Sequence, residues 1–344
     1  FMSKEMAEQP AVLERLALEA EDQIEALAEA IRASYGAYMV GCGTASYAAL
    51  TGSYLFSRIA SRHVNFSPGS EFKYYEHFLT PESLVIAFSQ SGETADIIEA
   101  MLAARSRGSK LAGVLNAPRS TLGRMVDLRV DLNAGPEQCV LSTKAYTAKV
   151  AVLLMTAHAL AGTSAEGRRL VLEAAAGIRE MLAPAWIDRV REIAANLYQA
   201  EHLFVIGRGL SYPTALEAAL KIKEVSYIHA EAYAAGELKH GPFALLSPDT
   251  PVIAICTPGP AYEVMLGNMK EMKARGTPIV AFGNEDDGDV SDIADVVIPL
   301  PKAHMWTQVL TSTVLLQLLA YHTANRLGRE IDMPRNLAKS VTVE

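Results

Sequence analysis

Three groups of polar residues in this 344-residue sequence carry side chains that could act together in catalysis. The loop Ser89–Thr94 (SQSGET) is rich in hydroxyl groups. The stretch from Lys221 to His240 contains lysine, glutamate and histidine, and a basic tail, PRNLAK, ends at Lys339. Lysine, glutamate and histidine can transfer protons and form imines, and a hydroxyl-rich loop can hold a phosphate. These are the groups needed to move protons and imines on a phosphorylated sugar.

The loop Ser89–Thr94 stands between a strand-like run that ends at Phe88 and a helix expected over residues 94–107. In a doubly wound α/β sheet, ligands bind beyond the carboxyl ends of the strands, and the first amides of a helix attract phosphate. Gly92 would let the backbone approach such a ligand closely. The alternative is a capping loop whose hydroxyls satisfy the helix and bind nothing. Taken alone, the loop favours neither interpretation.

Two further loops are expected to line the same crevice. Gly41–Ser46 follows the first strand-like run, and Val140–Lys144 precedes a helix expected over residues 143–160. The first loop resembles a dinucleotide-binding glycine pattern only weakly, because the third glycine is missing. Ser142 could cap the helix or contact a ligand, and for this residue alone the cap is the safer interpretation.

Lys221 and Glu224 are three residues apart and therefore lie on one face of the helix expected over residues 213–227. If they stood alone, a solvated ion pair worth a few tenths of a kcal/mol would explain them. Further titratable residues follow, however, and end with His240 before Gly241-Pro242. This turn would expose His240, which makes it a candidate acid or base.

The C-terminal tail shows little periodicity until its final residues, SVTVE, which resemble a strand. It could be a solvated end, as most termini are. Leu337 and Ala338, however, precede Lys339 and suggest that the tail docks on the protein. A lysine in a dry crevice would have a lowered pKa and could form a Schiff base.

An internal repeat indicates how these groups are positioned. Four elements of the first half recur in the second half at an offset of 166 to 168 positions. The matched residues are Gly41 and Gly207, Val85 and Val252, Gly108 and Gly276, and Asp127 and Asp295. Apolar strands alternating with amphipathic helices predict an α/β fold in which each copy is a doubly wound, mostly parallel sheet flanked by helices. The expected helices span residues 4–34, 48–59, 94–107, 143–160, 165–200 with a break at Pro184, 213–227 and 261–275.

The predicted domains are residues 1–164, which would hold the phosphate, and residues 165–344, which would supply the acid–base groups and the tail. The loop Thr257–Pro260 of the second copy matches the SQSGET loop but has one hydroxyl and two prolines without N–H donors. Only the first copy is therefore expected to bind phosphate.

Composition excludes several classes of protein. Lys and Arg total 31 against 39 Asp and Glu, and the net charge of −8 argues against a nucleic-acid partner. No apolar run approaches about 18 residues, so no membrane span is expected. The three cysteines, Cys42, Cys139 and Cys256, lack metal-ligand spacing. Reduced thiols in a cytoplasmic protein are the expected interpretation.

Five sequence segments together resemble a known family. The chain resembles, over almost its whole length, the isomerase half of the glutamine–fructose-6-phosphate amidotransferases, a tandem pair of sugar-isomerase (SIS) domains. The segments that carry the resemblance are KEMAEQP, SQSGETAD, LSTKAYT, KIKEVSYIHAEAYAAGELKHGP and PRNLAKSVTVE. The last two are long and highly specific.

The resemblance implies a role for each matching residue. Glu224 would move a proton between C1 and C2, His240 would open the sugar ring in a neighbouring subunit's site, and Lys339 would form the imine. Lys221 would stabilise the enediol or enolamine. The implied substrate-binding residues are Thr44, Ser46, Ser89, Gln90, Ser91, Thr94, Val140, Ser142 and Ala338. No metal or organic cofactor is implied, because lysines and positioned donors can stabilise an enediol.

The family architecture also implies a homodimer. Tyr233–Leu238 and a helix over Val309–His322 could form the contact between subunits, although both could equally be core.

Two departures from the family pattern shape the expected function. The glutaminase domain and its N-terminal nucleophilic cysteine have no match in this sequence, so ammonia release from glutamine is not expected. The family's CGTS loop reads Cys42–Ala45 here, which removes a hydroxyl that Ser46 could replace.

These features favour a glucosamine-6-phosphate deaminase that forms fructose 6-phosphate and ammonia from a phosphorylated amino sugar. Alternatives within the family are a fructosamine-6-phosphate deglycase, a galactosamine-6-phosphate isomerase or an ammonia-dependent synthase. A non-catalytic sugar-phosphate sensor is the alternative from another class.

Overall fold

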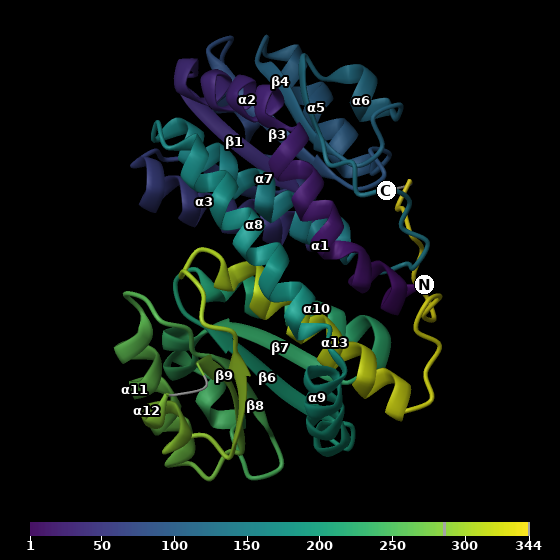
Figure 1. The fold of residues 1–344 in the computed structure, drawn as a ribbon. Coiled ribbons are helices and arrows are strands. Elements are labelled where there is room, and N and C mark those ends of the chain that lie inside the picture. Colours follow the sequence, from purple (N-terminus) through teal and green to yellow (C-terminus); the bar gives the residue numbers. More distant parts are fainter. Residues whose placement is uncertain (285–286, 343–344) are drawn as a thin grey trace. The chain divides into compact units, whose positions relative to one another are not determined.

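The computed structural model describes residues 1–284 and 287–342, and these residues form two five-stranded sheets in which all the paired strands are parallel (Figure 1). The first sheet has the order β2-β1-β3-β4-β5, and the second has the order β7-β6-β8-β9-β10. The strands of the first sheet are β1 (Gly36–Gly41), β2 (Asn65–Pro68), β3 (Ser83–Ser89), β4 (Lys110–Leu115) and β5 (Leu128–Asp131). Those of the second are β6 (His202–Gly207), β7 (His229–Ala234), β8 (Val252–Ile255), β9 (Ile279–Asn284) and β10 (Val296–Leu300).

The two sheets confirm the internal repeat, because their strands follow one another in the same spatial order. A glycine ends the first strand of each copy, Gly41 in β1 and Gly207 in β6, and both positions require glycine for the same physical reason. A Cβ on Gly41 would lie 2.8 Å from the backbone carbon of Ala45, and one on Gly207 would lie 2.2 Å from the carbonyl oxygen of Ser211. In both copies the strand end therefore lies against the start of the following helix, where only glycine fits.

The helices confirm the expected segments, with breaks that the sequence patterns indicated only in part. The segment 4–34 divides at Ala20, and the segment 165–200 divides so that a helix begins at Pro184, a favoured first helical residue. In the first half the helices are α1 (Met2–Glu19), α2 (Glu21–Ala33), α3 (Thr44–Ala60), α4 (Gly69–Phe72), α5 (Ala95–Ser106), α6 (Thr121–Met125), α7 (Lys144–Leu160) and α8 (Ser164–Met181), with the 3-10 turn η1 (Glu76–Phe78). In the second half they are α9 (Pro184–Leu197), α10 (Ser211–Ser226), α11 (Tyr262–Lys273), α12 (Gly288–Ser291) and α13 (Gln308–Arg326), with η2 (Ala235–His240) and η3 (Pro242–Leu245).

Each sheet has a matched hydrophobic core on one face. In the first copy, alternate residues of β3 such as Val85 and Ala87 pack with Ile97 and Met101 of α5. In the second copy, the equivalent strand β8 packs in the same way with Met265 and the other apolar residues of α11. Burial of this apolar area is the main force that holds the helices on the sheets.

Helix α13 is buried along almost its whole length and packs against α9 and α10 of its own copy. Of the two interpretations of Val309–His322, subunit contact or core, the structure therefore shows the core.

The chain divides into two compact units. The N-terminal unit comprises Glu8–Ala175 together with the tail residues from Ala338 onward, and the C-terminal unit comprises Phe1–Ala7 and Ala176–Leu337. The tail thus groups with the first sheet, and the predicted domain boundary after residue 164 stays a prediction. Within the described ranges, no helix has the length and apolar character that a membrane span requires.

Candidate active site

Thr44 and Ser89 lie at the carboxyl edge of the first sheet, at its topological switch point. The chain leaves β1 toward the edge strand β2 on one side, and leaves β3 toward β4 on the other. In such folds the ligand-binding crevice opens between the two central strands. Thr44 begins the helix after β1, Ser89 ends β3, and the two strands are hydrogen-bonded neighbours. Both residues are buried, as is Ser46 in the first turn of α3.

The SQSGET loop is held by its own hydroxyl groups. Ser89 Oγ accepts a hydrogen bond from the amide of Gly92 at 2.9 Å, and Ser91 Oγ accepts one from the amide of Glu93 at 3.2 Å. Thr94 stands at the N-cap of α5 but makes no side-chain capping bond. The alternative interpretation, in which these hydroxyls cap the helix, is therefore wrong, because Ser89 and Ser91 bond within the loop and Thr94 makes no capping bond. Each oxygen that accepts an N–H bond still carries a proton that could be donated to a phosphate oxygen.

Gly92 is required by the shape of this loop. Its φ of +68° is rare for other residues, and a Cβ at this position would lie 1.9 Å from Ser120 Oγ. Ser120 in turn caps α6. The glycine thus lets the loop pack closely on the turn that follows β4, as well as serving any close approach to a ligand.

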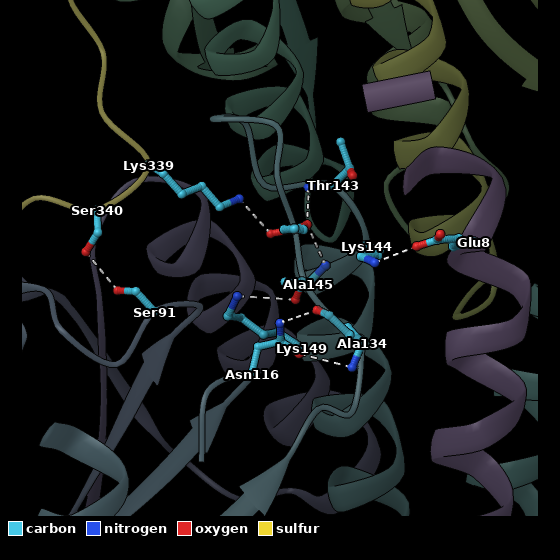
Figure 2. Close-up of polar contacts among 12 residues, drawn as sticks. Glu8, Ser91, Asn116, Ala134, Thr143, Lys144, Ala145, Lys149, Lys339 and Ser340 are labelled. Carbon is cyan, nitrogen blue, oxygen red and sulfur yellow. Dashed lines mark hydrogen bonds and ion pairs between the residues drawn. The ribbon is translucent and has the colours of Figure 1, made fainter. Parts of the chain in front are cut away.

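The C-terminal tail docks on this loop through polar groups (Figure 2). Ser340 Oγ donates to Ser91 Oγ at 3.0 Å, and the carbonyl of Val341 accepts the first amide of α5, from Ala95, at 3.2 Å. The expectation that the tail docks is confirmed, although Leu337 and Ala338 are themselves exposed. Residues 340–342 form no strand, since their hydrogen bonds go to a loop and a helix end; residues 343–344 of the predicted strand lie outside the described residues.

Lys339 is held by a glutamate that no sequence pattern singled out. Its Nζ lies 3.1 Å from Oε2 of Glu137, whose side chain is 0% exposed. The other oxygen of Glu137 accepts amide hydrogen bonds from Thr143 at 2.8 Å and from Ala145 at 3.1 Å. The lysine side chain is 26% exposed. The amine is therefore partly exposed and ion-paired, whereas the Schiff-base interpretation of the sequence placed it in a dry crevice.

The surroundings of Glu137 favour its charged form. Burial raises the pKa of Glu137, but the Lys339 ammonium, the Ala145 amide, Lys149 and the Thr143 amide outweigh burial and hold this pKa below its ordinary value of 4.5. Lys149 is itself buried and donates to the carbonyl of Ala145 at 3.2 Å. The carboxylate thus stays negatively charged beside two ammonium groups.

A depressed pKa makes the stabilising effect of Glu137 depend on pH. The carboxylate stabilises the fold at pH values above 4.5, and this contribution is lost as the pH falls through the lower folded-state pKa. The unfolding free energy of the unaltered protein should therefore exceed that of Glu137→Gln at neutral pH, and the difference should shrink in acid. Urea unfolding of both proteins from about pH 7 to about pH 3 measures this difference. A difference that does not change over that range would contradict the expectation.

Ser142 does not cap α7. Its hydroxyl oxygen is buried and has no hydrogen-bond partner among the residues that the structure describes. The helix begins at Lys144, its N-cap residue Thr143 makes no side-chain capping bond, and Glu137 accepts the amides there instead. The capping interpretation is therefore wrong, and a buried hydroxyl in this position is suited to bind a ligand.

A second polar cluster lies within the C-terminal unit on helix α10. The Lys221 side chain is 1% exposed and forms an ion pair with Glu224. Glu217, one turn earlier and equally buried, lies 3.5 Å from the same Nζ through Oε1. The solvated-pair interpretation is therefore wrong, because the cation is buried between two carboxylates. Glu217 was missed, although its spacing of four residues before Lys221 is a recognisable helical signal.

Glu224 and His240 both remain accessible in the C-terminal unit. The Glu224 side chain is 20% exposed. His240 ends η2 and is exposed before Gly241, whose φ is +138°, as the sequence predicted. The stretch between them includes the edge strand β7, which was not predicted because polar residues interrupt its apolar pattern.

The other predicted ligand contacts lie in the N-terminal unit. Gln90 and Val140 are half-buried in the loops after β3 and β5. In the C-terminal unit, Thr257 Oγ1 shares a hydrogen bond with Ser211 Oγ at 3.1 Å. Phosphate selectivity for the first copy stays a prediction. In the described ranges, no group of three or more His, Cys, Asp or Glu side chains could hold a metal ion, and the three cysteines are free.

Comparison with known proteins assigns the family. Residues 31–159 and 196–325 each match the SIS domain family. The chain belongs to the SIS-domain family. The first match lies in the N-terminal unit and the second in the C-terminal unit, so each sheet is the sheet of one SIS domain.

Individual relatives extend the comparison to the whole chain. Over 100% of its length the chain is 43% identical to a glutamine–fructose-6-phosphate aminotransferase (isomerizing) of Thermus thermophilus, and it spans 59% of that protein. A solved structure of the C-terminal domain of glucosamine-fructose-6-phosphate aminotransferase from Francisella tularensis is 30% identical, with a TM-score of 0.86 over 96% of this chain and 98% of that one. A structure described as glucosamine-6-phosphate deaminase from Thermotoga maritima is 25% identical, with a TM-score of 0.79 over 99% of each chain. The resemblance to the isomerase half of the amidotransferases is thereby confirmed.

Proposed function

We propose that this SIS protein is a phosphosugar isomerase that converts glucosamine 6-phosphate and water into fructose 6-phosphate and ammonia. The observation that carries the proposal is the meeting of a hydroxyl-rich loop and a lysine at the carboxyl edge of the first sheet. Ser340 Oγ lies 3.0 Å from Ser91 Oγ, and the adjacent Lys339 amine is held 3.1 Å from a buried carboxylate. A phosphate anchor and an amine on neighbouring residues suit an open-chain sugar phosphate.

The chemistry follows from the side chains available. His240 would move a proton from the C1 hydroxyl to the ring oxygen and so open the ring. Glu224 would take the C2 proton and return it to C1, which converts the amino aldehyde through an enolamine into a 2-imino ketose. The Lys221 ammonium, buried beside Glu224, would stabilise developing negative charge on the enolamine.

Release of ammonia completes the reaction. The Lys339 ammonium would pass a proton to the imine nitrogen of the 2-imino ketose, and the resulting free amine would attack C2 and expel ammonia, which forms an imine between the protein and the sugar. Water would then hydrolyse this imine, free the lysine and leave the C2 ketone of fructose 6-phosphate. The protons needed to expel ammonia come from the attacking amine and the solvent.

The substrate would be held by the loops at the switch point. The hydroxyls of the SQSGET loop would donate to the phosphate, and the buried hydroxyl of Ser142 would contact the sugar or its phosphate. The full set proposed to bind substrate is Thr44, Ser46, Ser89, Gln90, Ser91, Thr94, Val140, Ser142 and Ala338. We further propose a homodimer in which His240 completes the site of the partner subunit.

The same site could run in the direction of synthesis, from fructose 6-phosphate and ammonia. One observation favours this second candidate: the curated relatives are named aminotransferases, and the chain spans only 59% of their length. In such a protein the source of ammonia would lie outside the 344 residues of this chain. Both directions use the same proton transfer between C1 and C2.

An assay with glucosamine 6-phosphate tests the proposal directly. Ammonia and fructose 6-phosphate should appear in equal amounts, and in heavy water deuterium should enter the product at C1. A parallel reaction with fructose 6-phosphate and ammonium tests synthesis. Galactosamine 6-phosphate and fructosamine 6-phosphate serve as competing substrates. Binding of fructose 6-phosphate without ammonia release or deuterium exchange would point to a sensor and overturn the enzymatic proposal.

A further inference from the structure

Glu137 has the properties of a fixed support for the Lys339 amine. Its side chain is fully buried, and one of its oxygens is held by the amides of Thr143 and Ala145 at the start of α7. Helix α7 is itself buried from its first residue. The second oxygen accepts a hydrogen bond from Lys339 Nζ, 3.1 Å away and 202 residues along the chain. One carboxylate thus links the tail to a rigid helix end.

The loop that carries Glu137 is also fixed from the other side. Asn116, directly after β4, donates to the carbonyl of Gly135 at 2.8 Å and accepts the amide of Ala134 at 3.0 Å. Gly135 has a φ of +72°, which sets the turn. The loop is therefore held to the sheet through Asn116 as well as to α7 through Glu137. The Glu137 carboxylate therefore has a fixed position, and the ion pair forms only when the tail places the Lys339 amine beside it.

The remaining contacts of the tail in this unit are weaker. Ser340 and Val341 each make one hydrogen bond, and a typical neutral hydrogen bond contributes about 1 kcal/mol. Leu337, Ala338 and Val341 leave their side chains exposed, so apolar burial adds little. The ion pair to a buried carboxylate is accordingly the strongest contact that the tail makes in the N-terminal unit.

We propose that Glu137 is a positioning residue: it docks the tail and holds the Lys339 amine beside the SQSGET loop before the sugar arrives. This inference rests on the proposed function, in which that amine forms the imine. The role requires a negative charge. In Glu137→Gln, the side-chain NH₂ group would face either the Lys339 ammonium or the two backbone N–H groups of Thr143 and Ala145, and neither arrangement allows a hydrogen bond at that position. The role requires length as well, because aspartate would hold the charge one methylene further away.

The test compares Glu137→Gln and Glu137→Asp with a matched control, Glu99→Gln. Glu99 pairs with Lys73 in the same unit, so the control removes the same charge from an ion pair away from the tail. Hydrogen exchange of residues 338–342 in the ligand-free protein measures docking. Borohydride trapping with fructose 6-phosphate, located by peptide mass spectrometry, measures imine formation at Lys339. Titration with inorganic phosphate measures the anion site.

Glu137→Gln should increase the rate of hydrogen exchange in residues 338–342. It should also slow imine trapping by about a hundredfold, because displacing a reacting group by about 1 Å has an effect of this size. Phosphate affinity should change less than about threefold, because the hydroxyl loop is intact. Glu137→Asp should recover part of the trapping rate, and Glu99→Gln should match the unaltered protein. A purely structural role would lower the melting temperature without slowing the trapping rate of the folded protein.

Trapping in Glu137→Gln within twofold of the unaltered rate would overturn the inference. If this variant does not fold, Lys339→Met removes the other half of the pair and leaves the amide bonds of Glu137 in place. Unchanged tail exchange in Lys339→Met would then overturn it as well. Because tail exchange is measured without substrate, a lack of ammonia release from glucosamine 6-phosphate would count against the proposed function and not against the docking role.

Discussion

Replacing Glu224 with Gln should slow ammonia release from glucosamine 6-phosphate by about 10²- to 10⁴-fold, the usual contribution of a positioned general base. Glutamine keeps the shape of glutamate but cannot take up the C2 proton. The Glu224 side chain is partly exposed, so its substitution changes the chemistry of the site more than the packing of α10. The rate of ammonia release and the incorporation of deuterium at C1 measure the effect. Binding of fructose 6-phosphate should be almost unchanged.

Glu201→Gln is the matched control for this variant. Glu201 is exposed directly before β6, at the opposite edge of the second sheet from the carboxyl ends of its strands. The same change of charge there should leave the rate unaltered. If Glu224→Gln released ammonia as fast as the unaltered protein, the role of Glu224 as the base would be refuted.

Replacing Lys221 with Met should lower the free energy of unfolding by about 3–5 kcal/mol, as is typical when one member of a buried ion pair is removed. The Lys221 side chain is almost completely buried, and its ammonium lies between the carboxylates of Glu217 and Glu224. Methionine fills a similar volume but leaves two neighbouring negative charges without this cation. Urea unfolding at neutral pH measures the loss.

Lys223 provides the control on the same helix. It is exposed two residues further along α10, and Lys223→Met should change the unfolding free energy by less than about 0.5 kcal/mol. Similar losses in the two variants would mean that α10 responds to any loss of lysine charge. The burial of Lys221 would then not be the cause.

The fold could be predicted because the repeated signals are local. Strand runs such as the one ending at Phe88 are apolar throughout, as strands covered on both faces must be, and the matched glycines Gly41 and Gly207 mark a close approach of backbone to backbone. Strands β2 and β7 were not predicted, because neither is a long apolar run. Strand β2 has only four residues, and polar side chains interrupt the apolar pattern of β7.

The sequence predicted only those residues of the candidate site whose type and local context indicate a function. Lysine, glutamate and histidine near glycine-rich turns were found, and the exposure of His240 is confirmed. The capping role of Ser142 was wrong, and the docking of the tail was predicted without its partners, because local capping rules and tail composition contain no information on long-range contacts. Glu137 had no signal at all: it is a single acidic residue in an irregular loop.

The amino-acid sequence alone determined three features of this protein: two copies of an α/β sheet, a serine-rich turn at a strand end, and the reactive side chains near it. Those features depend on periodicity and on conformations that a few neighbouring residues impose. Only the tertiary structure decided which charges meet, because the contact between Glu137 and Lys339 joins residues 202 positions apart and the burial of Lys221 depends on the packing around α10. Burial and long-range pairing are properties of the folded chain, and they determine the protonation and the placement of the groups that would act on a sugar.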